Sequence, residues 1–157
     1  MTHRMPPRAQ LGKRLLATTS ALALAVGIGT AAHAGNVTNP NPIPNPTVTA
    51  GQTVSAIVFN DGQTHTGSIV NNGTVNSGET AIAVAGQTTI AGSLVNNGSI
   101  TAKNAFGILV VAAAVNGGIS NSGSISAGRA GIIINYDAQL QGSFTSHTIS
   151  AGLRVRF

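Results

Sequence analysis

Short hydrophobic runs recur along the chain, and each is bounded by glycine, asparagine or serine. Clear examples lie at residues 81–84, 107–111 and 131–134, and they are rich in isoleucine and valine. Apolar, β-branched runs of this length between turn-forming residues are typical of β-strands. The pattern therefore predicts an all-β chain built from short strands.

A nine-residue pattern repeats every 25 residues. It reads GSIVNNGTV at 67–75, GSLVNNGSI at 92–100 and GGISNSGSI at 117–125. The same step relates Ile90, Val115 and Leu140, outside the pattern. A fixed period of about 20–50 residues indicates a solenoid in which each repeat forms one structural unit. The prediction is a parallel β-helix of about three coils over residues 51–141.

One segment of the repeat region also fits a helix. Residues 105–115 (AFGILVVAAAV) are almost entirely apolar, and periodicity alone does not distinguish a buried helix from a strand over so short a run. Val115, however, falls in phase with two residues that lie in β-rich surroundings. The phase favours a strand.

Asparagine and glycine occupy the predicted corner of each coil. Both residue types tolerate the positive φ angles that tight turns use. Coils stacked about 4.8 Å apart would bring the asparagine amides into hydrogen-bonding range, as a structural ladder with no catalytic role. The residues of this turn ladder are Asn71, Gly73, Asn96, Gly98, Asn121 and Gly123.

Residues 1–34 have the organisation of a secretory signal peptide. Basic residues end at Lys13-Arg14, an apolar stretch covers residues 15–32, and Ala32-His33-Ala34 supplies small residues before a cleavage site at Gly35. We expect recognition by the Sec export machinery. The alternative, a membrane anchor, is disfavoured because threonine, serine and glycine interrupt the apolar stretch.

Residues 35–50 are rich in proline and asparagine. Four prolines at alternate positions, 40 to 46, favour extended chain without backbone donors. We expect a linker or an N-terminal lead-in here, followed by a segment at Thr47–Asn60 that covers one end of the solenoid.

The chain ends in a second type of pattern, over residues 142–157. From residue 148 onwards apolar and polar residues alternate strictly, and the last residue is aromatic. About ten alternating residues match one strand of an outer-membrane β-barrel. The alternative is an amphipathic edge strand that covers the solenoid.

Together, the G-x-I-x-N-x-G-x-I repeats, the export signal and the terminal AGLRVRF resemble the bacterial autotransporters of type V secretion. The resemblance implies a right-handed β-helical passenger and a closing barrel strand that the barrel-assembly machinery recognises. In this chain the assembly signal would comprise Ile149, Leu153, Val155 and Phe157. One strand does not close a barrel, because every backbone polar group in lipid needs a partner. Residues 142–157 therefore read as the remnant of a translocator.

Composition and charge limit the functions that we expect of this chain. Only 7% of the residues are charged, and half of the eight basic residues lie in the first fourteen, so the net charge of +5 does not indicate a nucleic-acid partner. The acids Asp61, Glu79 and Asp137 do not share the 25-residue spacing, and we interpret His65 and His147 as surface residues. Cysteine is absent. We expect no catalytic residues, metal or cofactor.

The sequence thus predicts a non-enzymatic, exported passenger fragment with a structural or adhesive role at the outer membrane or cell surface. A second hypothesis is a free-standing secreted or periplasmic β-solenoid adhesin. A third, disfavoured by the scattered acids, is a β-helical polysaccharide-active enzyme.

Overall fold

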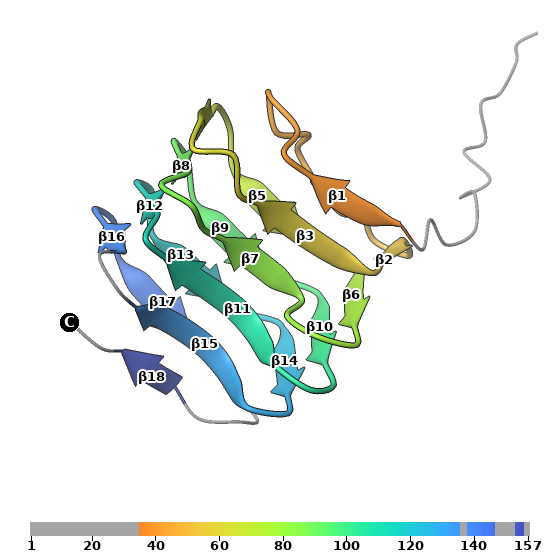
Figure 1. Cartoon of the computed structure of the whole chain (residues 1–157). Coiled ribbons are helices and arrows are strands. Elements are labelled where there is room, and N and C mark those ends of the chain that lie inside the picture. The colour runs from red at the N-terminus through yellow and green to blue at the C-terminus, as the bar shows by residue number, and fades with distance from the viewer. Residues whose placement is uncertain (1–34, 136–137, 147–152, 156–157) are drawn as a thin grey trace, which may run out of the picture.

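The computed structural model describes residues 35–135, 138–146 and 153–155, and the description below concerns these residues (Figure 1). They form an all-β solenoid with no helix among them, and hence no helix that could cross a membrane. The strands run parallel to their neighbours in the adjacent coils. The predicted fold class is confirmed.

Four parallel sheets enclose the solenoid, and we number them in the order in which one coil visits them. Sheet I has the order β1 (Asn36–Thr38), β3 (Ala56–Phe59), β7 (Ile82–Val84), β11 (Phe106–Val111), β15 (Ala130–Asn135) and β18 (Leu153–Val155). Sheet II contains β4 (Thr64–His65), β8 (Thr89–Ile90), β12 (Ala114–Val115) and β16 (Gln139–Leu140). Sheet III contains β5 (Ile69–Asn71), β9 (Leu94–Asn96), β13 (Ile119–Asn121) and β17 (Phe144–Ser146). Sheet IV contains β2 (Thr53–Val54), β6 (Thr74–Ser77), β10 (Ser99–Ala102) and β14 (Ser124–Ala127).

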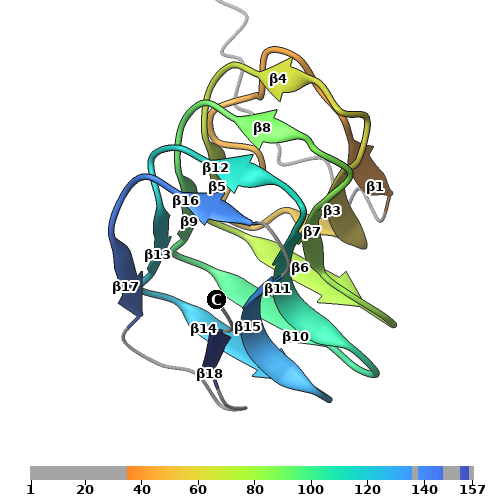
Figure 2. The same cartoon turned by 60° about the vertical axis from the view of Figure 1, so that its left-hand side comes forward.

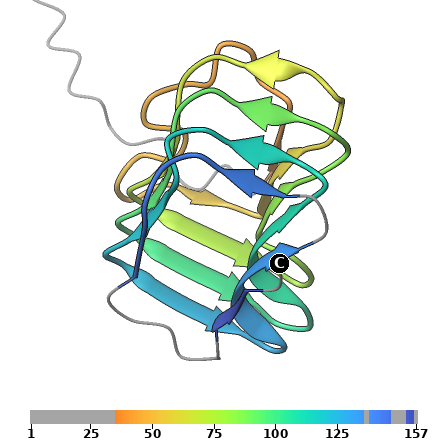
Figure 3. The same ribbon diagram turned by 90° about the vertical axis from the view of Figure 1, so that its left-hand side faces the viewer.

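The core lies inside the coils, because alternate residues of each strand point inward and most of these inward residues are apolar. Figures 2 and 3 show the coils stacked from the orange N-terminal segment to the blue C-terminal one. In sheet IV, Val75, Ile100 and Ile125 pair directly across the strands and are fully buried. Stacking identical positions excludes water from a continuous apolar column. A coil is therefore recognised by its buried, inward-pointing residues, and it does not need the nine-residue pattern.

The solenoid has about four coils, since three of its sheets contain four strands each, and not the three expected from the repeat. The fourth strand of each of these sheets lies outside the three copies of the nine-residue pattern: β16 in sheet II, β17 in sheet III and β2 in sheet IV. Apolar side chains point inward there without the pattern; Val54 in β2, for example, is fully buried. The segment 105–115 forms strands β11 and β12 and no helix, as its phase predicted.

The 25-residue step holds in sheets II and III and between β6, β10 and β14 of sheet IV, but it varies in sheet I. There Ile82 pairs with Ile108 and Ile108 with Ile132, which are steps of 26 (108 − 82) and 24 (132 − 108) residues. The extra residue precedes β11, and the corner that follows is shorter and contains Ala112 at φ 46°. One corner therefore compensates for the other, and the register of sheet II is restored.

Residues 35–50, expected to form a linker or an N-terminal lead-in, pack against the first coil and do not form a free linker. β1 pairs with β3, Val48 bridges to Asn71, and the side chains of Ile43 and Val48 are buried. The segment packs because it contains apolar side chains that it can bury: Ile43 between two prolines and Val48 after the last one. We call residues 36–48 the N-terminal cap. Of the covering segment expected at Thr47–Asn60, residues 47 and 48 belong to this cap. The strands β2 and β3, which follow, are members of sheets IV and I.

Candidate functional site

The predicted asparagine column is present at the end of sheet III. The strands β5, β9 and β13 are in register, so Asn71, Asn96 and Asn121 stack directly. The amide of Asn71 donates to Oδ1 of Asn96 at 2.7 Å, and the amide of Asn96 donates to Oδ1 of Asn121 at 2.6 Å. All three side chains are fully buried. Each amide thereby provides a hydrogen-bond partner to the next at a position that is buried from solvent.

The glycines of the corner serve a purpose different from the one predicted. Gly73, Gly98 and Gly123 do not have positive φ. A Cβ atom at Gly98 would overlap the carbonyl oxygen of Gly73, and one at Gly123 would overlap that of Gly98. Glycine is therefore required by the close approach of stacked backbones, not by the turn conformation.

Sheet IV and its corner with sheet III present a polar outer surface. Asn97 donates to Oδ1 of Asn72 at 2.9 Å, and Ser122 donates to Oδ1 of Asn97 at 2.8 Å. The neighbouring columns are equally regular because β6, β10 and β14 are in register. We call this surface the polar face; its exposed or half-exposed residues are Asn72, Thr74, Asn76, Asn97, Ser99, Thr101, Ser122, Ser124 and Ser126. None of them carries a charge.

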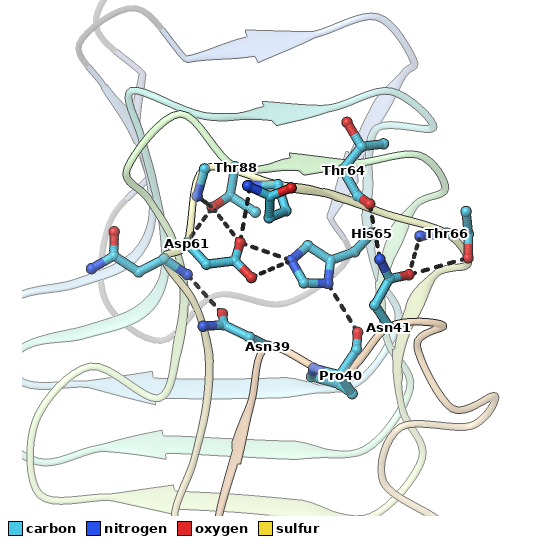
Figure 4. Close-up of polar contacts among 11 residues, drawn as sticks. Asn39, Pro40, Asn41, Asp61, Thr64, His65, Thr66 and Thr88 are labelled. Atoms are coloured by element: carbon cyan, nitrogen blue, oxygen red, sulfur yellow. Dashed lines mark hydrogen bonds and ion pairs between the residues drawn. The ribbon is translucent and has the colours of Figure 1, made fainter.

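A second polar cluster lies at the corner between sheets I and II, near the cap (Figure 4). The Nε2 atom of His65 lies 2.9 and 3.1 Å from the two carboxylate oxygens of Asp61, and its Nδ1 atom lies 2.9 Å from the carbonyl oxygen of Pro40. The ring packs edge-on against Phe59, with 4.8 Å between centroids. His65 is 1% exposed, whereas the Asp61 side chain is 28% exposed.

Thr88, from the next coil, completes this cluster. Its buried Oγ1 accepts from the backbone N–H groups of Asp61 and Gly62, each at 3.1 Å. The backbone N–H of Gln63 donates to the Asp61 carboxylate at 3.1 Å. The turn around Asp61 is thus held from two coils.

These contacts favour the ionised form of Asp61. The hydrogen bond from His65 is the largest cause that lowers the pKa of Asp61 below its ordinary value of 3.8, and the bond from Gln63 adds to it. Because the folded-state pKa is the lower one, the stabilisation is present above pH 3.8 and is lost as the pH falls through the depressed value.

The cluster corrects the sequence-based interpretation of His65 as a surface residue. It pairs a histidine with a carboxylate, but both ring nitrogens are occupied by protein oxygens. A general base needs a free nitrogen within reach of its substrate. With both contacts in place, this arrangement orients chain segments and has no nitrogen left for proton transfer.

The repeat contained the information that would have located His65. Ile90, Val115 and Leu140 form one inward column, and one step of 25 residues towards the N-terminus reaches residue 65. A histidine at an inward position must have its nitrogens bonded. The spacing of four residues between Asp61 and His65 then suggests the partner.

The other predicted site residues are described only in part. Leu153 and Val155 lie in β18, which pairs in parallel with β15. Ile149, Phe157, His147, Asp137 and the export signal at 1–34 lie outside the described residues. Within the described residues, no group of three or more histidine, aspartate or glutamate side chains is arranged to hold a metal ion.

Comparison of the chain with protein-family models, curated proteins and solved structures found no match.

Proposed function

We propose that this chain is an exported, non-enzymatic β-solenoid that acts as a structural or adhesive module at the cell surface or in the envelope, in the manner of an autotransporter passenger. The observation that carries the proposal is the polar face, an uncharged array of amides and hydroxyls repeated on three coils. Such an array adheres through many weak hydrogen bonds, each of which contributes little after exchange with water.

The chemistry of the His65–Asp61 cluster supports a non-enzymatic role. The His65–Asp61 pair is engaged by Pro40, Gln63 and Thr88 within the fold. It is also located at the corner between sheets I and II, away from the polar face on sheet IV. We therefore assign the His65–Asp61 pair no part in adhesion.

The adhesive role can be tested with a neutral polysaccharide surface such as agarose beads. Thr101→Lys combined with Ser126→Lys would place two cations on the polar face and remove two hydroxyls. We expect about tenfold weaker retention of the purified protein, the equivalent of one or two hydrogen bonds. Ala91→Lys, at an exposed position between sheets II and III, is the matched control and should leave retention unchanged. Equal retention of all three proteins would contradict the role of the polar face.

The location can be tested separately by fractionating a Gram-negative host that expresses the full chain. If the terminal strand engages the barrel-assembly machinery, removal of residues 148–157 abolishes sedimentation with the outer membrane. The free-standing secreted or periplasmic solenoid predicts the same soluble fraction for both proteins.

A further inference from the structure

The outer surface of sheet I differs in composition from that of sheet IV. The strands of sheet IV alternate between polar and apolar residues, as in TVNS of β6 and SITA of β10. The strands of sheet I are apolar on both faces: β3 reads AIVF, β11 reads FGILVV and β15 begins AGIII. Near-continuous apolar runs are typical of parallel strands that are covered on both sides. The pattern therefore indicates that something covers the outside of sheet I.

The outward apolar side chains of sheet I form one row across four coils. They lie in direct register on β3, β7, β11 and β15. Each is half-exposed, whereas both of its neighbours in the strand are buried. Figure 1 looks onto this face, and no described strand lies in front of it. A contiguous exposed apolar patch marks an interaction surface. We call this row the apolar strip; its residues are Val58, Ala83, Leu109 and Ile133.

A column of polar residues borders the apolar strip at the corner between sheets IV and I. Glu79, Asn104 and Arg129 lie there in three successive coils, 25 residues apart, and all three are exposed. The amide of Asn104 donates to Oε1 of Glu79 at 3.3 Å, and the Arg129 guanidinium lies 5.8 Å from the centre of the Phe106 ring. Lys103 lies one residue further from β11. The column is thus negative in the coil of β7, neutral in that of β11 and positive in that of β15.

We propose that sheet I is the interface of a symmetric dimer, in which two copies of the chain pack their apolar strips face to face with their coils in opposite order. A two-fold axis that runs along β11 places β7 of each copy opposite β15 of the other. Ala83 then faces Ile133 of the second copy, a small side chain against a large one, and Leu109 packs beside its own counterpart. The same axis sets Glu79 opposite Arg129 of the second copy, at both ends of the column. Shape and charge therefore favour one arrangement.

A dimer with its coils in the same order matches less well. It sets Ala83 against Ala83 and Ile133 against Ile133, which leaves space in one coil and crowds another. It also brings Glu79 to the corner between sheets I and II, where the structure describes the acid Asp61 and no lysine or arginine. The opposite-order contact closes on two copies because it is symmetric. The polar face on sheet IV stays exposed in both copies, so the dimer does not depend on the adhesive role.

Sedimentation velocity of the full chain tests the dimer. Between about 1 and 100 μM we expect the mass to rise from one chain to two and no further. Leu109→Lys brings two ammonium groups together at the axis and should weaken association at least about a hundredfold. Val95→Lys is the matched control, because Val95 is a half-exposed outward residue in β9 of sheet III. A dimer that survives Leu109→Lys, or that both variants abolish equally, would overturn the proposal.

Charge exchange at the border tests the order of the coils. Glu79→Arg sets two guanidinium groups opposite each other, and Arg129→Glu sets two carboxylates opposite each other, so each variant should associate about tenfold more weakly. The combined variant exchanges the two charges and should recover the original affinity to within about threefold. Both residues are exposed, so these variants keep the solenoid core intact. A combined variant that associates no better than the single ones would refute the opposite-order dimer.

Two other occupants of sheet I would leave the protein monomeric. One is the apolar stretch at residues 15–32 of the same chain, and the other is a lipid surface. A full chain that stays monomeric at about 100 μM therefore overturns the proposal. Flotation of that monomer with phosphatidylcholine vesicles, lost in Leu109→Lys, would assign the apolar strip to a lipid surface instead.

Discussion

At the scale of single residues, the polar side chains buried in this narrow core include three amides and one imidazole, and each of them has hydrogen-bond partners within the protein. Asn96 both accepts from Asn71 and donates to Asn121, with no exposure to solvent. Asn97, the next residue, makes the same type of ladder contact on the outer surface. The two positions therefore separate the energetic role of a buried amide from that of an exposed one.

Asn96→Ala should destabilise the protein by about 2–4 kcal/mol, because it leaves buried hydrogen-bonding groups on both neighbouring asparagines without this partner. Asn97→Ala should cost less than about 1 kcal/mol, since water replaces its partner. Urea unfolding of both variants measures the difference. Equal costs would mean that the ladder does not contribute to stability.

At the scale of elements, the corners determine how closely the coils stack. The corner column of Gly73, Gly98 and Gly123 places each glycine directly over a carbonyl oxygen of the coil before it. At Gly78, on another corner, a Cβ atom would meet nothing within 4 Å. Glycine at the first set is thus a requirement of the stack, and glycine at residue 78 is not.

We expect Gly98→Ala to destabilise the solenoid by about 1–3 kcal/mol or more, because the overlap is with backbone that has no room to move. Gly78→Ala should be neutral or stabilise the protein by up to about 1 kcal/mol through the unfolded state. Thermal unfolding monitored by circular dichroism would compare them. If Gly98→Ala proved neutral, the coils would have to be further apart than the structure places them.

At the scale of the whole molecule, the N-terminal cap supplies hydrogen-bond partners to the edges of β3, β4 and β5 at one end of the solenoid. Without it, the edges of β3, β4 and β5 lose the contacts made by β1, Asn41 and Val48. Unpaired parallel edges are templates for a second chain, and a head-to-tail contact of this type does not close on itself.

A chain that begins at residue 50 should therefore associate with increasing concentration, whereas one that begins at residue 35 keeps the cap and serves as its control. Light scattering coupled to size-exclusion chromatography measures both masses. A shortened chain with the same mass per particle as the control would show that the cap does not protect the edges.

The amino-acid sequence by itself determined the fold class, the 25-residue period and the inward columns. These features are local: alternation within a strand and a fixed number of residues per coil place Val75, Ile100 and Ile125 over one another whatever lies elsewhere. The asparagine ladder followed from the same period. For this reason it was predictable residue by residue.

The tertiary structure alone decided the cap, the reason for the corner glycines and the His65 cluster. That cluster joins Pro40, Asp61, His65 and Thr88 from the cap and two coils, across separations of up to 27 residues. The 25-residue period places His65 in an inward column, but Pro40 and Thr88 are not indicated by any period as its neighbours. They meet because the corners bring irregular segments together at the end of the stack, where the first coil has no preceding coil to satisfy its edge.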